Sequence, residues 1–257
     1  MARRLIDSDR QRDRNTQQRL QGQIERRYMS ELAKELRNAM NGAVEHFERS
    51  GNVRVDDQHA RRVYRMLRGE WESSIEVFGD RILEAIKSTH GPRVVKADRD
   101  SLLERIVQQW LLTRGGERIA DDIAETTKRQ IAQQVAMGRR EGLGTSAIAR
   151  QVRDRIGGLS LVRAAVIART ETHNAANFGQ IEAIKDTGLK ARKEWISAAD
   201  DRTRDEEFNH VAADGQTVEL DASFSISGES LAYPGDPGGS AGNVINCRCA
   251  TGFVTHD

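Results

Sequence analysis

The sequence contains little cysteine, proline or aromatic residue. Its 257 residues include 2 cysteines, 3 prolines and 5% aromatic side chains. Cys247 and Cys249 are separated by one residue, and a bridge across that spacing would be strained, so a disulfide framework is excluded and reduced thiols are expected. Only Pro92 lies before residue 234, so proline interrupts the first 230 residues once. Long helices are therefore permitted over most of the chain.

The chain also lacks a strong net charge and any long apolar run. The formal net charge is +1, which disfavours a freestanding DNA-binding protein. No apolar stretch of the sequence approaches the length that spans a bilayer, and no signal-peptide core follows the basic start. The protein is therefore expected to be made and used in a reducing cytoplasm, with no membrane partner.

Positive charge is concentrated at the start of the chain. Arginines there outnumber carboxylates: Arg3, Arg4, Arg10, Arg12, Arg14, Arg19, Arg26 and Arg27 stand against Asp7, Asp9, Asp13 and Glu25. A basic arm of this kind could contact phosphates or an acidic protein surface. A frayed, solvated terminus would have the same composition, and the sequence alone leaves both interpretations open.

The first 142 residues have the apolar spacing of helices. Charged residues make up 31% of the chain and hydrophobic residues 37%, which suits solvated helices with narrow apolar stripes. Steps of three and four residues predict a helix over about 9–49, a second ending near His90, a third capped by Asp98 or Asp100, and a fourth over about 119–141. Gly51, the Gly91-Pro92 pair and the Gly115-Gly116 pair are the expected breaks.

After residue 142 the pattern changes. A short helix is predicted over 147–155 and a second helix over 161–186, separated by Gly157-Gly158. Short strands are predicted over 193–197, 217–220 and 224–226. The apolar face of the second helix is expected to include Val162. The predicted class is α+β, with a long, mainly helical region over 1–142 for docking or oligomerisation and a small α+β module over 143–257.

Three motifs follow one another in this second part. The first is Ala168-Arg169-Thr170-Glu171, the second is Trp195 with Asp201-Arg202-Thr203-Arg204, and the third is a loop with Pro234 and Asp236 that closes on Asn246-Cys247-Arg248-Cys249. In this order they resemble the Mu F-like phage head morphogenesis proteins, which are minor capsid components of tailed phages. The resemblance covers roughly residues 150–254.

The resemblance implies a function and a set of partners. It implies a non-catalytic minor capsid protein of a tailed phage or prophage, located in the virion and assembled in the bacterial cytoplasm. The implied partners are the portal and other head proteins, with contact to packaged DNA through the basic N-terminus and a homo-oligomer as further options. Some relatives carry an enzymatic domain after this module; the sequence here ends at Asp257, so no appended activity is expected.

The resemblance also implies architectural roles for the motif residues. Arg169 and Glu171 are expected to be buried and to hold their helix against the small sheet through charge-assisted bonds. The acidic pair Asp200-Asp201 with the following Arg202-Thr203-Arg204 is expected to form a turn in which aspartate accepts hydrogen bonds, and this turn is expected to fix the sheet to the closing loop. Asp201 as a general base would need a poised partner, and none is near in sequence. His173, directly after the first motif, is expected on the surface.

Cys247 and Cys249 also allow two functional interpretations, a metal site and a catalytic nucleophile. With His210 they would form a conceivable Zn²⁺ site, since cysteine and histidine are the usual zinc ligands. Alternatively, either cysteine could be a nucleophile with His210 as its base, in a Cys- or metal-dependent hydrolase or effector domain delivered with the particle. A Cys-x-Cys pair is a weak ligand signature, and His210 stands six residues after Arg204, further than in many relatives. Packing of two small buried cysteines is therefore favoured, with no cofactor apart from a possible zinc.

Overall fold

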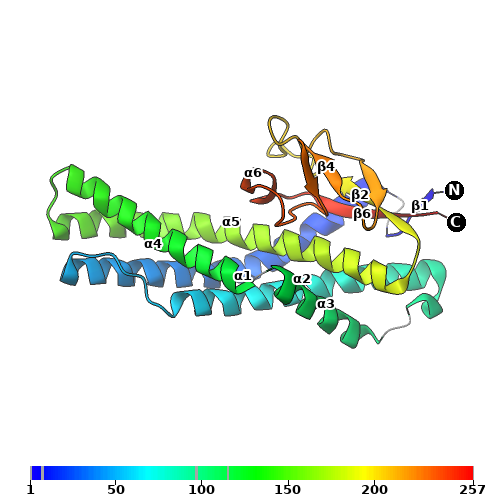
Figure 1. The fold of residues 1–257 in the computed structure, drawn as a ribbon, viewed down its shortest axis with the longest axis horizontal. Coiled ribbons are helices and arrows are strands. Elements are labelled where there is room, and N and C mark those ends of the chain that lie inside the picture. Colours follow the sequence, from blue (N-terminus) through cyan, green and yellow to red (C-terminus); the bar gives the residue numbers. More distant parts are fainter. Residues whose placement is uncertain (1, 7–8, 96–97, 115, 257) are drawn as a thin grey trace. The chain divides into compact units, whose positions relative to one another are not determined.

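The computed structural model describes residues 2–6, 9–95, 98–114 and 116–256, and Figure 1 shows their arrangement into long helices and short strands. The helices are α1 (Arg10–Ser50), α2 (His59–His90), a 3-10 turn (Pro92–Val94), α3 (Arg99–Arg114), α4 (Gly116–Arg140), α5 (Thr145–Thr187) and α6 (Ala241–Val244). The strands are β1 (Ala2–Arg4), β2 (Ala191–Ile196), β3 (Thr217–Glu219), β4 (Phe224–Ile226), β5 (Glu229–Leu231) and β6 (Ala250–His256). The predicted α+β class is confirmed.

The first four helices form where the apolar spacing predicts them, and their ends follow local chemistry. Gly51 ends α1 with a φ of 74°, a conformation that glycine adopts without strain, and its amide donates to the carbonyl of Phe47 at 2.8 Å. Asp98 caps α3, because its carboxylate accepts from the amide of Ser101 at 3.2 Å. The predicted break at Gly115 lies outside the described residues.

The predicted break at Gly157-Gly158 is wrong. Helix α5 runs without interruption from Thr145 to Thr187. Ile148, Val152 and Ile156 precede the two glycines, and all three are buried. Burial of three large apolar side chains contributes roughly 1.5–3 kcal/mol each. That outweighs a cost of about 1 kcal/mol for each glycine in a helix, so packing overrides local propensity.

The chain folds into two compact units made of interleaved segments. We call them the sheet unit (Met1–Glu25, Glu70–Arg114 and Arg169–Asp257) and the bundle unit (Arg26–Gly69 and Gly115–Ala168). Neither unit coincides with the predicted regions 1–142 and 143–257. That boundary falls in the loop between α4 and α5, and as a domain limit it stays a prediction.

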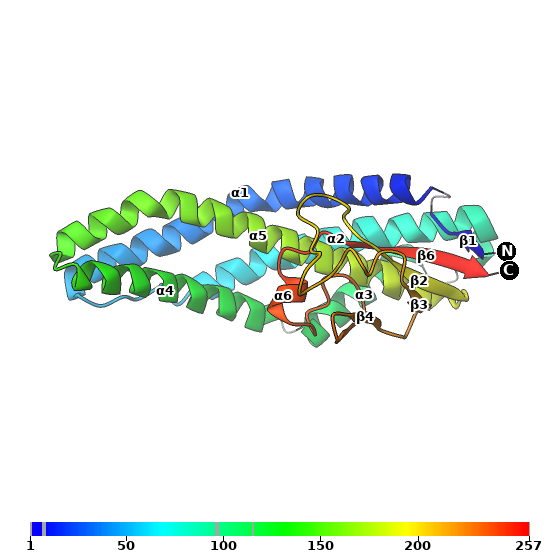
Figure 2. The ribbon, with the colours of Figure 1, turned by 90° about the horizontal axis from the view of Figure 1, so that it is seen from above.

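The bundle unit consists of helical segments that lie side by side in both views (Figures 1 and 2). It contains the second part of α1, the first part of α2, α4, and the first part of α5. The buried residues of one core cluster are Ala39, Met40, Ala43, Val44, Phe47, Val55, Ile131, Val135, Ile148, Ala149, Val152 and Ile156. The sequence predicts Val162 on the apolar face of its helix, now part of α5. Its side chain is 67% exposed, so that prediction is wrong.

The sheet unit carries a four-stranded antiparallel sheet in the order β1-β6-β2-β3. Strand β6 pairs with β2 from Ile196↔Ala250 to Ala191↔Thr255 and with β1 on its other edge. Strands β4 and β5 form a separate hairpin. The core beside them comprises Trp195, Ala213, Phe224, Ile226, Leu231, Cys247 and Cys249. The closing cysteines thus lie in the core of this unit.

Two N-terminal arginines form ion pairs with carboxylates inside the sheet unit. Arg10 pairs with Asp214 at 2.6 Å and with Glu194 at 2.8 Å, and Arg4 pairs with the same Glu194. The alternative of a frayed terminus is therefore wrong, because helix α1 begins at Arg10. Arg12, Arg19, Arg26 and Arg27 are exposed on α1; Asp7 and the side chain of Arg3 lie outside the described residues.

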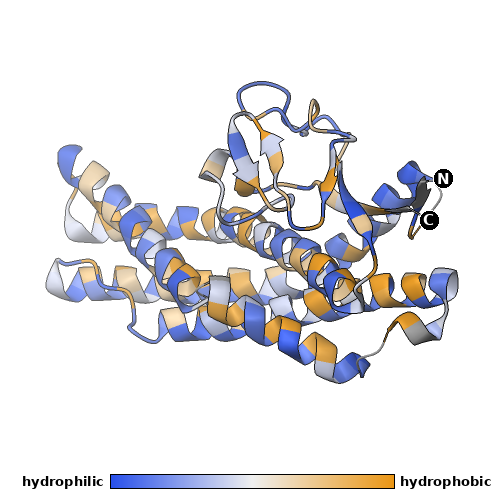
Figure 3. Ribbon diagram, turned by 45° about the vertical axis from the view of Figure 1, so that its right-hand side comes forward, coloured by the Kyte–Doolittle hydropathy of each residue, from blue (hydrophilic) through white to orange (hydrophobic). Residues whose placement is uncertain are grey.

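Hydropathy follows this packing. Figure 3 shows hydrophobic and hydrophilic residues alternating around the long helices, as expected of amphipathic helices. Over the described residues, we find no helix with the length and apolar character that a bilayer crossing requires.

Candidate functional site

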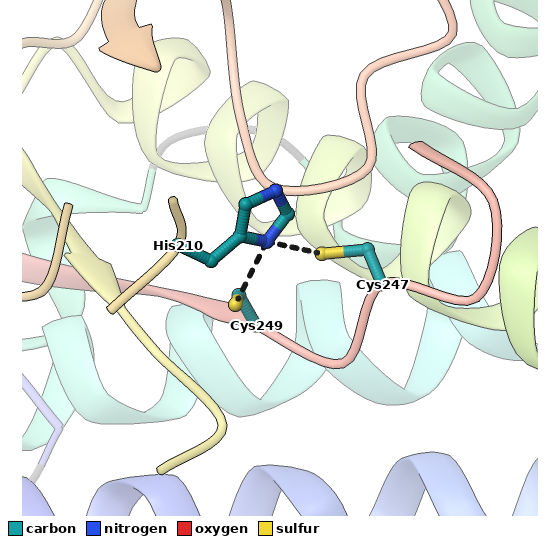
Figure 4. A group of neighbouring side chains, drawn as sticks. All are labelled: His210, Cys247 and Cys249. Carbon is teal, nitrogen blue, oxygen red and sulfur yellow. Dashed lines mark hydrogen bonds between the residues drawn. The ribbon is translucent and has the colours of Figure 1, made fainter. Parts of the chain in front are cut away.

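His210, Cys247 and Cys249 come together in the sheet unit, although His210 is more than thirty residues from either cysteine (Figure 4). The sulfur of Cys247 lies 3.6 Å from Nδ1 of His210, and the sulfur of Cys249 lies 3.5 Å from the same nitrogen. The three potential ligand atoms all lie within 4.8 Å of one another. The structure therefore gathers the three residues that the sequence nominated for zinc.

The imidazole of His210 is held in one orientation. Its Nε2 lies 3.1 Å from the side-chain oxygen of Asn243, which is fully buried at the end of α6. With that oxygen as acceptor, Nε2 carries the proton and Nδ1 presents its lone pair to the two sulfurs. The ring also packs edge-on against Trp195, with centroids 5.3 Å apart. Asn243 and Trp195 thus aim Nδ1 at the cysteines.

Burial and mutual hydrogen bonding separate the two thiols electrostatically. A hydrogen bond from Cys249, followed by His210, lowers the pKa of Cys247 well below the usual value for a thiol. Burial raises the pKa of Cys249 well above that value. Cys247 is therefore the thiol that ionises more readily of the two.

The group is closed to bulk solvent. The exposed fractions are 1% for His210 and 2% for each cysteine. A catalytic cysteine must reach its substrate, so this burial argues against the nucleophile reading. Among the residues that the structure describes, no Asp or Glu joins the group, so a carboxylate general base is lacking there as well.

The first motif holds the backbone just before Cys247. Arg169 donates to the side-chain oxygen of Asn246 and lies 3.4 Å from Glu25. The hydroxyl of Thr170 accepts from the amide of Asn246 at 2.9 Å. Asn246 has a φ of 63°, a strained conformation for a residue with a side chain. Two adjacent residues of α5 therefore support the turn that presents Cys247.

Glu171 has a different partner from the one expected. Its carboxylate accepts from the indole N–H of Trp71 on α2 at 3.0 Å, and it does not pin α5 to the small sheet. Burial raises its pKa to about 7. The neighbouring Glu70 is also buried, accepts from the hydroxyl of Thr172 at 2.6 Å, and has its pKa raised well above the usual value by burial. Glu171 therefore serves the contact between two helices of the sheet unit.

The prediction that His173 lies on the surface is also wrong. Its side chain is only 3% exposed, and Nε2 lies 3.1 Å from Glu25 on α1. A helix covered on several sides buries polar residues that spacing alone would assign to solvent, and a buried imidazole then needs a partner.

The second motif forms the expected turn, and Asp200 is the member of the acidic pair that accepts. The carboxylate of Asp200 accepts from the Thr203 hydroxyl at 3.0 Å and from the guanidinium of Arg248 at 2.8 Å. Arg204 donates to the carbonyl of Ile245. Asp201 and Arg202 are exposed. The turn thus forms hydrogen bonds with the closing segment on both sides of Cys247, at Ile245 and at Arg248.

The third motif is fixed by Asp236. Its carboxylate accepts from the amide of Ala232 at 2.8 Å and from the amide of Gly238 at 3.0 Å, the pattern by which aspartate stabilises a turn. Gly235 has a φ of 82°, and a Cβ there would lie 2.4 Å from the side chain of Asn174. Only glycine fits this close approach of the loop to α5.

Two structural residues escaped the sequence analysis. Asn177 on α5 donates to the carbonyl of Pro234 at 3.0 Å and accepts from the amide of Thr251 at 2.9 Å. Lys193 on β2 donates to the carbonyls of Leu220 and Ala232, and burial lowers its pKa to about 8. The available signal for Asn177 was its position seven residues after Thr170, which places both on one helix face.

Comparison with known proteins identifies one family. A family model described as "Phage Mu protein F like protein" matches residues 129–252. The matched span contains all three motifs and the group formed by His210, Cys247 and Cys249. Neither a curated protein nor a solved structure matches the chain.

Proposed function

We propose, from the match of residues 129–252 to the phage Mu protein F like family, that the chain is a minor capsid protein of a tailed phage or prophage. In this role it acts in head morphogenesis, resides in the virion, and is assembled in the cytoplasm of the bacterial host. The family match is the observation that carries the proposal.

The roles of the motif residues support a structural function. Arg169, Thr170, Asp200 and Arg204 each bond to the segment between Ile245 and Arg248. The hydrogen-bonding groups of these side chains are engaged by the closing segment, whereas a catalytic acid or base must remain available to a substrate. We therefore propose that the module is a rigid interaction head and that it has no turnover of its own.

The portal is the partner that we propose first. The bundle unit exposes two neighbouring apolar residues on α5, Leu161 at 48% and Val162 at 67%. Large apolar residues that are adjacent and exposed favour contact with another protein surface. We assign these two residues to the surface that meets the portal.

Packaged DNA is a second proposed partner. Arg12, Arg19 and Arg26 are exposed on α1 and follow one another at intervals of seven residues, which keeps them close to one face of a helix. Exposed arginines attract phosphates, and such binding weakens steeply with salt. Arg4 and Arg10 are excluded from this role because carboxylates of the sheet unit hold them.

Co-purification tests the portal proposal. The portal from the same genome is co-expressed with this chain and isolated through a tag on the portal. We expect the chain to remain bound, and the double variant Leu161→Ser with Val162→Ser to be lost from the complex. The matched control replaces two exposed charged residues of the same helix, Arg150→Ser with Asp154→Ser, and should stay bound. A wild-type chain that elutes free of the portal would contradict the proposal.

A further inference from the structure

We propose that His210, Cys247 and Cys249 bind one zinc ion, which fastens the closing segment of the sheet unit to the loop that follows β2. This inference does not depend on the role in the head, because it concerns only side chains within the sheet unit. It replaces the simple packing of two cysteines that the sequence favoured.

The distances fit zinc. Zinc bonds to sulfur at about 2.3 Å and to histidine nitrogen at about 2.0–2.1 Å, and its geometry is tetrahedral, so a coordinated sulfur and nitrogen lie about 3.6 Å apart. The two sulfurs lie 3.6 Å and 3.5 Å from Nδ1 of His210. Both pairs thus have the separation of ligands that share one zinc ion.

Hydrogen bonds alone account less well for this arrangement. The lone pair of Nδ1 accepts well from only one thiol, yet both sulfurs lie at nearly the same distance from it. All three side chains are buried, so bulk water does not solvate them. Without metal, Cys249 bonds to Cys247 and to the backbone of Ala198. A cation at the point that all three atoms face would engage both sulfurs and Nδ1 at once, which accounts for their nearly equal distances.

The surroundings hold the ligands ready. The Nε2–H of His210 donates to Asn243, which fixes the tautomer in the manner usual for metal-bound histidines. The backbone around the cysteines is fastened by Thr170 at Asn246 and by Asp200 at Arg248. A site whose ligands are already positioned loses little conformational freedom on binding metal.

The ligand types favour zinc over harder metals. Two thiolates and an imidazole suit zinc, whereas Mg²⁺ and Ca²⁺ prefer oxygen ligands. Three protein ligands leave one tetrahedral position for a water molecule. Because no carboxylate of the described residues joins the group, that water has no neighbouring general base, and the role we assign to the metal is structural.

Elemental analysis of the full chain tests the site. The protein is expressed without added metal, purified without chelator, and measured by mass spectrometry for zinc, iron, copper and nickel. We expect about one zinc per chain. The single variants Cys247→Ser, Cys249→Ser and His210→Gln should each lose at least roughly three quarters of the metal, because one ligand in three is removed. His46→Gln changes a half-buried histidine of the bundle unit and should retain the metal.

A second measurement guards against variants that fail to fold. Metal is removed from the wild-type chain, and Co²⁺ is titrated in under reducing conditions. Tetrahedral binding through two thiolates should give an intense visible absorption and a sulfur-to-cobalt band in the near ultraviolet, saturating at about one equivalent and displaced by Zn²⁺. A wild-type chain with neither bound metal nor this spectrum would overturn the proposal, as would metal that persists in all three ligand variants. Both readouts use the isolated chain, so they fail or succeed independently of binding to heads.

Discussion

The amide of Thr251 donates a hydrogen bond to the side-chain oxygen of Asn177, which lies 74 positions earlier in the chain, on α5. The same side chain donates from its nitrogen to the carbonyl of Pro234. A single buried amide therefore joins the long helix, the proline-containing loop and strand β6. The closing module is built against this part of α5, so the stability of the module should depend on the polar residues of that helix face.

Replacement of Asn177 tests this dependence. Asn177→Ala leaves the amide of Thr251 and the carbonyl of Pro234 buried without their partner, and each such loss costs about 1–3 kcal/mol. We expect a decrease of about 2–4 kcal/mol in the free energy of unfolding, measured by chemical denaturation. The matched control is Asn38→Ala, at an exposed position of α1, which should change it by less than about 0.5 kcal/mol. Equal effects of the two variants would remove Asn177 from its structural role.

Two glycines of α5 should respond in opposite ways to alanine. A Cβ at Gly179 would lie 3.0 Å from Cα of Ile75, so Gly179→Ala forces α5 against the backbone of α2. A Cβ at Gly157 would meet nothing within 4 Å. We expect Gly179→Ala to destabilise by about 1–3 kcal/mol through overpacking. Gly157→Ala should stabilise by about 0.5–1 kcal/mol through helix propensity. Thermal unfolding of the pair measures both, and a stabilising Gly179→Ala would contradict the close packing.

Glu171 should make stability depend on pH. Burial raises its pKa to about 7, above the value of about 4.3 for an unfolded chain. The folded state therefore binds more protons between these values. The contribution of Glu171 is fully present below about pH 4 and is lost as pH rises through about 7.

The variant Glu171→Gln removes the charge while its amide oxygen can still accept from Trp71. Relative to the wild type, its free energy of unfolding should increase by on the order of 3 kcal/mol between about pH 4 and about pH 8. Denaturant titrations across this range measure the difference. Glu31→Gln, at an exposed position of α1, serves as the control and should show no comparable trend. A difference that does not change with pH would contradict a pKa of Glu171 raised into this range.

The predicted helical region should not fold cooperatively by itself. In a fragment of residues 1–142, the segments 70–114 lose the residues from 169 onward with which they form a compact unit. Amphipathic helices depend on such packing. We expect far-ultraviolet circular dichroism to show mainly helix, with thermal melting that is broad compared with the full chain. A mainly β spectrum would contradict the helix assignment, and a sharp transition would contradict the interleaved units.

Local patterns were sufficient for part of this structure. Apolar spacing predicted α1 to α4, and the residues Asp98 and Gly51 marked two helix ends. The same reasoning failed at Gly157-Gly158, because it could not see the core that Ile148, Val152 and Ile156 enter. Strand β6 escaped it as well, since its pairing with β2 joins segments about sixty residues apart and leaves no periodic trace.

The site was predictable in residue type but not in geometry. Cysteine and histidine are the usual zinc ligands, so His210, Cys247 and Cys249 could be named from the sequence as a candidate set. Asn243 and Asp200 could not, because an amide or carboxylate acquires its role only from the group it faces. Of the acidic pair, Asp200 accepts in the turn whereas Asp201 is exposed, so one position along the chain decides the role.

Analysis of purified heads tests the central claim, that this chain is a minor capsid protein. Heads are purified from cells that express the complete particle genes, washed in high salt, and quantified by mass spectrometry against the major capsid protein. The account predicts that the chain is present in the heads at a small fraction of the major capsid copy number, and that it sediments with them. Heads that contain the portal and package DNA but lack this chain would contradict the account.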